Sequence, residues 1–334
     1  MNKYIYTIVL VITMIFMSAC AQKVQIKALS PAEIDRASTT KKIAVVEFEN
    51  DIVGLSSSIE SNLARFRIEN KPFFTMVNRN EINQVIREQK FQNSGLIETE
   101  KIVEVGNLIG AEALISGSVR RPSMSDTHFY ETRAECANRK CSELRYYDVH
   151  CTKRVIGLGA DIKMIDVTQG DIIYSDSLLR NASFKHCNDD SRILPAKRDI
   201  AQRLAREMAN DFTYKLTPHY VYFEVALIES GDLDYTDTEE QLLENALEYI
   251  KHNRLDKAER LLKELVDATQ QQSYVAFYNL GVVKEAQGDF AKAKRYYEKA
   301  DNLTVESVEV INSAYVRINE AIENHKQTSQ QLQR

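Results

Sequence analysis

The stretch VIGLGADIKMIDVTQGDIIYSDSLL, residues 155–179, decides the fold class that the sequence predicts. From Ile156 to Met164 every second residue is apolar, which is typical of a strand with one buried face. Gln169 and Gly170 supply a turn, and the chain then returns through a second apolar run. The pattern therefore predicts a β-hairpin.

On both sides of this hairpin, apolar runs that predict strands alternate with segments of helical spacing. Such alternation indicates a layered α/β domain, and the helix that follows the hairpin is expected to cover one sheet face. The predicted strands span residues 41–50, 73–79 and 111–119, and the predicted helices span residues 56–66, a segment from Asn80, residues 103–110 and residues 199–216.

The first residues have the features of an export signal. Lys3 supplies a positive charge, and the apolar run of residues 5–17 is shorter than the roughly 20 residues of a membrane span. Residues 17–20, MSAC, resemble the lipobox of bacterial lipoproteins. This resemblance implies that Cys20 carries the lipid, palmitate included, and that Ala21 directs the protein to the outer membrane. A plain secretory signal or a short anchor helix is the alternative.

Export would place the other cysteines in an oxidising compartment, where an even number of them predicts disulfides. Four cysteines allow three connectivities. We favour Cys136 with Cys141, which would pin a turn, and Cys151 with Cys187, which would join neighbouring strands. The other connectivities stay open.

A zinc site is the alternative role of these cysteines. His128, His150 and His186 lie near them in the sequence and could supply nitrogen ligands. The spacing contains no Cys-x-x-Cys pair, and periplasmic thiols tend to oxidise, so we expect disulfides and no metal.

The order of the predicted elements resembles the CsgG family of curli-assembly lipoproteins, the HfaB-like proteins included. The blocks IAVVEFEN, FFTMVNRNEINQVIREQK, GNLIGAEALISGSV and ADIKMIDVTQGDII carry this resemblance, which covers residues 41–216. Related domains occur in flagellar-assembly lipoproteins and in the LpoB activator of cell-wall synthases. The resemblance implies a non-catalytic periplasmic α/β domain that can form homo-oligomers.

In the CsgG channel two hairpins per subunit form the pore, and the first would follow Val119 here. A membrane strand needs about 9–11 residues with apolar side chains at alternate positions. Residues 120–154 contain eight Lys or Arg and five Asp or Glu, and neither face of this stretch is apolar. We therefore expect it to stay in the periplasm as a disulfide-pinned hairpin or loop.

The C-terminal part contains an internal repeat. NRLDKAERLLKEL, residues 253–265, recurs as GDFAKAKRYYEKA, residues 288–300. The second copy resembles the tetratricopeptide (TPR) pattern, in which Phe277, Leu280 and Gly281 pack between helices. Such repeats present a concave face to partners, and a plain helical hairpin bundle is the alternative. The predicted partner-binding residues are Asn245, Tyr249, Asn279, Val283 and Lys284.

No arrangement of a nucleophile and a base stands out, so we expect neither an enzyme nor a cofactor. Gly157 and Gly159 lack the third glycine of a phosphate loop, and the net charge of −5 suggests no nucleic-acid partner. We expect a lipid-anchored outer-membrane protein that faces the periplasm and recruits an envelope or secreted protein through TPR repeats. A CsgG-type secretion channel and an LpoB-like activator of a cell-wall synthase are the alternatives.

The fold class expected is a CsgG-like layered α/β domain followed by an all-α helical hairpin domain. The predicted domains are a signal peptide at residues 1–20, a tether at 21–40, the α/β domain at 41–217, a linker at 218–238, the TPR-like repeats at 239–326 and a polar tail at 327–334.

Overall fold

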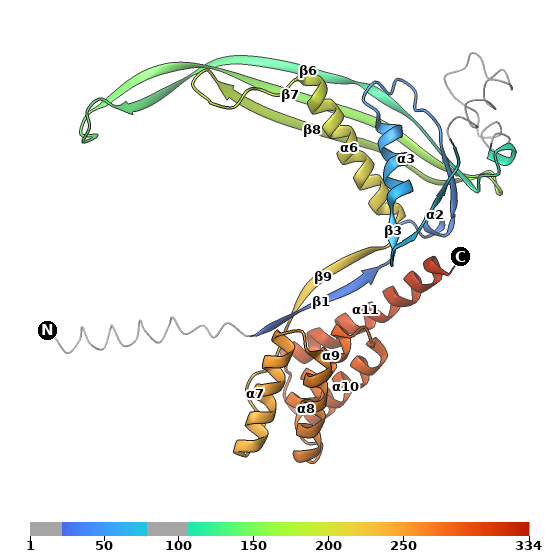
Figure 1. Ribbon diagram of the computed structural model, residues 1–334, viewed down its shortest axis with the longest axis vertical. Coiled ribbons are helices and arrows are strands. Elements are labelled where there is room, and N and C mark those ends of the chain that lie inside the picture. The colour runs from blue at the N-terminus through green and yellow to red at the C-terminus, as the bar shows by residue number, and fades with distance from the viewer. Residues whose placement is uncertain (1–21, 79–105, 334) are drawn as a thin grey trace. The chain divides into compact units, whose positions relative to one another are not determined.

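The computed structural model describes residues 22–78 and 106–333, which form two compact units (Figure 1). Among these residues, the first unit consists of residues 22–30 and 219–329. The second unit consists of residues 31–218 with residues 330–333.

The second unit is built on a sheet whose described strands follow the order β5 (Thr75–Met76), β2 (Lys42–Val45), β6 (Ala113–Cys136), β7 (Leu144–Asp166) and β8 (Ile172–Cys187). β2 pairs in parallel with β5 and β6, whereas β6, β7 and β8 are antiparallel. The predicted hairpin is confirmed, because β7 returns into β8 through a turn at Gly170, whose φ of 74° favours glycine.

Helices α3 (Leu55–Arg65) and α6 (Lys197–Leu216) pack beside each other on one face of this sheet (Figure 1). A short helix α2 (Asp35–Thr39) and the two-stranded ribbon of β3 (Arg67–Ile68) and β4 (Lys71–Pro72) are further elements of this unit. The predicted layered α/β class is confirmed.

The core of this unit follows the alternation along β7. All five predicted positions, Ile156, Leu158, Ala160, Ile162 and Met164, are fully buried. They lie on the face that α6 covers, and the buried residues of α6 recur every three or four positions, as a helix on a sheet requires. The register of β7 is therefore fixed by its apolar face.

A β-bulge interrupts the pairing of β6 with β7. The register shifts between Arg120 and Ser123, around Pro122, which has no N–H to donate to a ladder. Glycines on β7 allow the close approach: an added Cβ would lie 2.5 Å from the Ser123 Oγ at Gly157 and 2.6 Å from the Arg120 Nε at Gly159. These two glycines therefore serve strand packing.

Beyond the bulge the three strands continue as an extension that we call the arm, residues 123–155 and 181–187 (Figure 1). A disulfide between Cys136 and Cys141 closes the hairpin tip. A second disulfide joins Cys151 on β7 to the directly opposite Cys187 on β8. This is the connectivity that we favoured from the sequence, and the predicted hairpin or loop is a hairpin.

The zinc alternative fails on this geometry. Cys151 and Cys187 are both in a disulfide and offer no thiolate, although the Glu131 carboxylate lies 3.9 Å from the Cys187 Sγ. The three histidines lie on the opposite face of the arm, because side chains alternate along a strand and the three occupy rows that do not contain the cysteines.

The first unit joins a two-stranded antiparallel sheet to helices. β1 (Lys23–Ser30) pairs along its whole length with β9 (His219–Ala226). The helices are α7 (Asp237–Lys251), α8 (Leu255–Ala268), α9 (Tyr274–Ala286), α10 (Phe290–Leu303) and α11 (Glu309–Leu332), of which α11 ends in residues of the second unit (Figure 1). One apolar core includes residues from β1, β9 and all five helices.

One expectation from the sequence is wrong in this unit. The predicted tether is not an unstructured segment, because residues 23–30 form β1, with Ile26 fully buried. The predicted all-α domain at residues 239–326 is helical, and the first half of the predicted linker forms β9. β1 has no partner nearby in the sequence, so its pairing could not be predicted locally. The predicted helix from Asn80 and the lipidation site Cys20 lie outside the described residues.

A buried polar cluster fixes α9 against the helices that follow it. The fully buried Glu285 accepts two hydrogen bonds from the Arg317 guanidinium, at 2.8 and 2.9 Å, and one from the Tyr297 hydroxyl at 2.6 Å. Burial, with the nearby Glu285, raises the pKa of Tyr297. The predicted packing residues Phe277, Leu280 and Gly281 all lie in buried positions.

We predict that Gly281→Ala destabilises the protein although alanine is the better helix former by about 1 kcal/mol. The added Cβ would lie 2.5 Å from the Tyr297 ring, which is fully buried and anchored through its hydroxyl. Overpacking of this kind costs about 1–3 kcal/mol, so the unfolding midpoint in urea should fall. An unchanged or higher midpoint would mean that the ring can move aside.

The two disulfides should differ in their contribution to stability. The Cys151–Cys187 bond spans 36 positions and the Cys136–Cys141 bond only five. The loop-entropy relation then gives about 4 kcal/mol for the long loop and about 2 kcal/mol for the short one. Urea unfolding of the two double-alanine variants checks this order, and a larger loss for the Cys136 and Cys141 pair would contradict it.

Candidate functional site

The helices of the first unit do not offer the partner groove that the sequence suggested. Asn279 and Val283 are fully buried, and Lys284 is 7% exposed. These three predictions of partner-binding residues are therefore wrong. The helical pattern correctly separates core from surface in α7, but in α9 nearly all residues are buried.

The chain itself covers this face of α9. The Asn279 side chain donates to the Ile228 carbonyl at 2.8 Å and accepts from the Ile228 N–H at 3.1 Å. The Tyr278 hydroxyl donates to the Ala226 carbonyl at 2.8 Å. The segment after β9 thus lies along α9 as a peptide ligand would. It occupies the Asn279 side chain, which we had predicted to bind a partner.

Lys284 is also used inside the unit. Its Nζ lies 2.6 Å from the Glu259 carboxylate and donates to the Gln287 side chain. Desolvation opposes the charge of Glu259, but hydrogen bonds from Lys263 and Lys284 outweigh it and lower the pKa of Glu259 to about 2. The Lys284 ammonium therefore joins α9 to α8.

The remaining two predicted residues stay accessible on α7. Asn245 is exposed, and Tyr249 is half-buried with its ring 5.1 Å from the Lys257 Nζ. Because they are four residues apart on one helix, they lie on the same face. They remain predictions for a partner surface.

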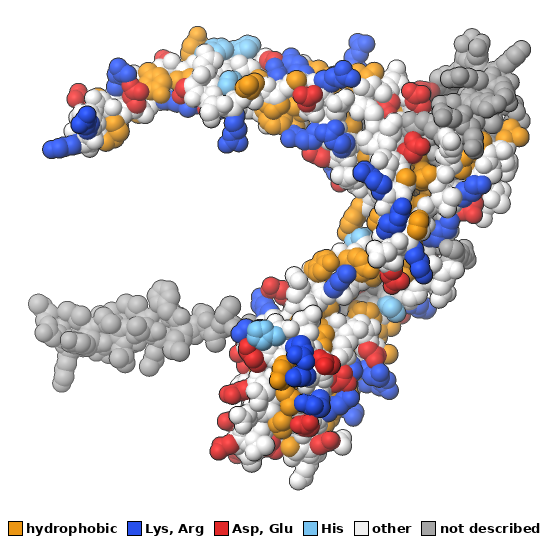
Figure 2. Space-filling view, viewed as in Figure 1, with side chains coloured by type: hydrophobic (Ala, Val, Ile, Leu, Met, Phe, Trp, Pro, Cys, Tyr) orange, Lys and Arg blue, Asp and Glu red, His pale blue; other side chains and the backbone are white. Residues whose placement is uncertain are grey.

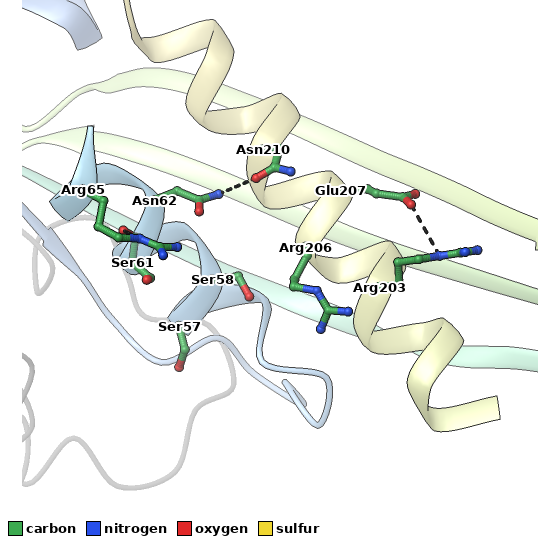
Figure 3. Close-up of a pocket in the computed structure, with 9 residues that line it drawn as sticks. All are labelled: Ser57, Ser58, Ser61, Asn62, Arg65, Arg203, Arg206, Glu207 and Asn210. Atoms are coloured by element: carbon green, nitrogen blue, oxygen red, sulfur yellow. Dashed lines mark hydrogen bonds and ion pairs between the residues drawn. The ribbon is translucent and has the colours of Figure 1, made fainter. Parts of the chain in front are cut away.

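A polar groove between α3 and α6 is the site that we did not predict (Figure 3). It has a volume of about 580 Å³ and is lined by serines, an asparagine and an arginine of α3 and by arginines, a glutamate and an asparagine of α6. A hydrogen bond of 2.8 Å from the Asn62 amide to the Asn210 carbonyl oxygen joins the two helices.

The two helices run in the same direction, so the lining residues fall into register (Figure 3). Arg206 lies one turn before the bridge between Asn62 and Asn210, and Arg65 lies almost one turn after it. Arg203 points away from the groove, where its Nε lies 3.5 Å from Glu207 and its guanidinium lies 5.0 Å from the Phe184 ring.

Local signals for this groove exist on each helix. Ser58, Asn62 and Arg65 follow helical spacing on α3, on a different face from the fully buried Ile59 and Leu63. Such stripes usually mark a solvated face. Nothing in the sequence pairs this stripe with Arg206 and Asn210, because their contact depends on both helices packing on one sheet.

None of the helices among the described residues has the length and apolar run that are needed to cross a membrane.

Comparison with known proteins bears on the N-terminal half. Residues 27–122 match the sequence profile of a family described as "Curli production assembly/transport component CsgG". The match begins in β1 and ends at the bulge of β6, so it includes residues that we had assigned to a tether. No curated protein matches the chain in sequence.

Solved structures show weaker likeness. Lipoprotein GNA1162 from Neisseria meningitidis is 14% identical, with a TM-score of 0.27 over 52% of this chain and 98% of that one. The LpoB C-terminal domain from Salmonella enterica is 12% identical, with a TM-score of 0.25 over 44% of this chain and 94% of that one. TolB from Acinetobacter baumannii is 17% identical, with a TM-score of 0.27, and the 58% of this chain that is aligned spans only 31% of TolB.

These TM-scores are too low to support an argument about function, which leaves the family match. A domain similar to CsgG is therefore found at residues 27–122, in the part of the chain that carries β2, α3 and the start of β6.

Proposed function

We propose that this protein is a lipid-anchored, non-catalytic assembly factor of the bacterial envelope that recruits a protein partner. The observation that carries the proposal is the match of residues 27–122 to a family described as a curli assembly and transport component. A domain of this kind acts through the surfaces that it presents, and the structure offers polar helical surfaces on both units.

The proposed location is the periplasmic side of the outer membrane. The MSAC sequence at residues 17–20 supports lipidation of Cys20, and Ala21 supports the outer membrane as the destination. Two disulfides in the arm fit an exported protein, since they persist in oxidising compartments.

The proposed partner surface of the first unit is the exposed face of α7. A TPR-like hairpin stack would bind an extended segment along its first helices, but residues 226–228 already occupy α9. Asn245 and Tyr249 remain to supply an amide and an aromatic ring on α7. The proposed adaptor role therefore depends on the hairpin of α7 and α8 and not on the hairpin of α9 and α10.

The family description also names transport, which supports a secretion channel as the second candidate. The charges of the arm favour the adaptor. Asp126 and Arg154 pair on one face of the arm, and Glu131 and Lys185 pair on the other. A charge that faces lipid costs about 2–4 kcal/mol near the bilayer midplane, and either face of the arm would carry several. An activator of a cell-wall synthase would need the same tethered surface as the adaptor.

Cys20→Ser should move the protein from the membrane fraction to the soluble periplasm, because the lipid is the proposed anchor. Fractionation of cells that express the variant, followed by immunoblotting, measures the change. If the variant stays in the membrane fraction, an ordinary anchor helix holds the protein and the lipoprotein proposal fails.

Asn245→Ala with Tyr249→Ala should weaken capture of the envelope partner at least tenfold while leaving the fold intact. Cross-linking in intact cells and mass spectrometry identify the partner with the wild-type chain, and the variant is then compared quantitatively. Arg260→Ala with Glu264→Ala is the matched control, since it also leaves the net charge unchanged and removes an exposed pair from α8.

Equal capture by both variants would contradict this surface. Asn279→Ala provides a further contrast, because it leaves the Ile228 N–H and carbonyl without their partner and should lower stability by about 1–3 kcal/mol. Its effect on capture should then follow its loss of folded protein.

A further inference from the structure

The groove between α3 and α6 carries positive charge that the described residues do not neutralise. Arg206 is exposed and forms no ion pair or hydrogen bond within the described part of the chain. Arg65 uses its Nε to donate to the Ser61 carbonyl at 3.1 Å, which leaves its two terminal nitrogens without a described partner. Arg203 and Glu207 balance each other. The groove therefore holds two unmatched cations.

Several arginines of the same unit are, by contrast, paired with carboxylates. Arg36, Arg133, Arg154 and Arg180 each pair with one or two aspartates. Figure 2 shows Lys and Arg side chains gathered over α3 and α6. Because neighbouring guanidinium groups repel each other, an arrangement of unpaired arginines in one groove is suited to an anionic ligand.

The spacing of the groove indicates what kind of anion fits. Arg206 and Arg65 lie on opposite sides of the Asn62–Asn210 bridge, which separates them by about two helical turns, or roughly 10 Å. A peptide in the extended polyproline II conformation advances about 3.1 Å per residue with three residues per turn, so two carboxylates three residues apart would lie on one side of it, about 9 Å apart. A single phosphate would reach only one of the arginines.

The bridge between the arginines suits a peptide backbone. The Asn62 amide donates to Asn210, so the Asn62 carbonyl oxygen and the Asn210 amino group have no partner among the described residues. One can accept a hydrogen bond from a backbone N–H and the other can donate to a backbone carbonyl. Both groups of a peptide unit would thus be satisfied midway between the two cations.

We propose that the α3–α6 groove binds an extended acidic peptide segment of a protein partner, with carboxylates three residues apart on Arg206 and Arg65 and backbone on Asn62 and Asn210. This site is independent of the proposed surface on α7, because it lies in the other unit. It would bind its ligand through two arginines, whereas the α7 surface offers an amide and an aromatic ring. Failure of one proposal leaves the other standing.

The test uses the purified chain from Ala21 onward and a fluorescent hexapeptide with two glutamates separated by two glycines. Binding is measured by fluorescence anisotropy at low ionic strength, since exposed charges are screened at high salt. The wild-type chain should bind this peptide and should bind its glutamine analogue at least tenfold more weakly. Arg65→Gln with Arg206→Gln should also weaken binding of the glutamate peptide at least tenfold.

Arg67→Gln with Arg198→Gln is the matched control, because it removes the same charge from exposed arginines of the same unit that do not line the groove. This control should bind within twofold of the wild type. If both double variants lose peptide binding equally, the loss reflects only the change in net charge, and the proposal is overturned. The absence of any binding by the wild type, or full displacement of the peptide by an equal concentration of inorganic phosphate, would overturn it as well.

Discussion

The antiparallel pairing of β7 with both of its neighbours is the constraint on which the second unit depends. β7 hydrogen-bonds to β6 and β8, and its even-numbered residues from Ile156 to Met164 are fully buried. A shift of one residue would turn this apolar face to solvent, so the register is held by packing as well as by the ladder. α6 must then cover that face, and α3 packs beside α6. The position of the polar groove between α3 and α6 follows from this packing.

The first unit depends instead on polar groups that find partners inside it. Asn279 pairs with both backbone groups of Ile228, and Glu285 pairs with Arg317 and Tyr297. A buried charge or amide without partners is costly, so these bonds restrict which segments can lie against α9. The second hairpin of the predicted repeat, α9 with α10, therefore holds the chain's own segment after β9.

Charge is distributed differently over the arm and the groove of the second unit. On the arm, Asp126 pairs with Arg154 and Glu131 with Lys185, so many charges on both faces are matched across strands. In the groove, Arg65 and Arg206 keep their charges unmatched within the described residues. Matched cross-strand charges mainly hold the register of an exposed ribbon, whereas unmatched charges in a groove lower the free energy of binding an anion. The two surfaces therefore have different roles.

The sequence by itself determined the elements whose signals are local. The β7–β8 hairpin, the helix α6, the buried face from Ile156 to Met164 and the helical C-terminal part follow from periodicity and turn residues. The sequence favoured one cysteine pairing but left the others open, and the structure decided it by placing Cys151 opposite Cys187. The tertiary structure alone decided the pairing of β1 with β9, the occupation of α9 by residues 226–228 and the meeting of α3 with α6. These contacts join residues as many as 203 positions apart, and no local pattern of side chains encodes which distant backbone or helix will satisfy them.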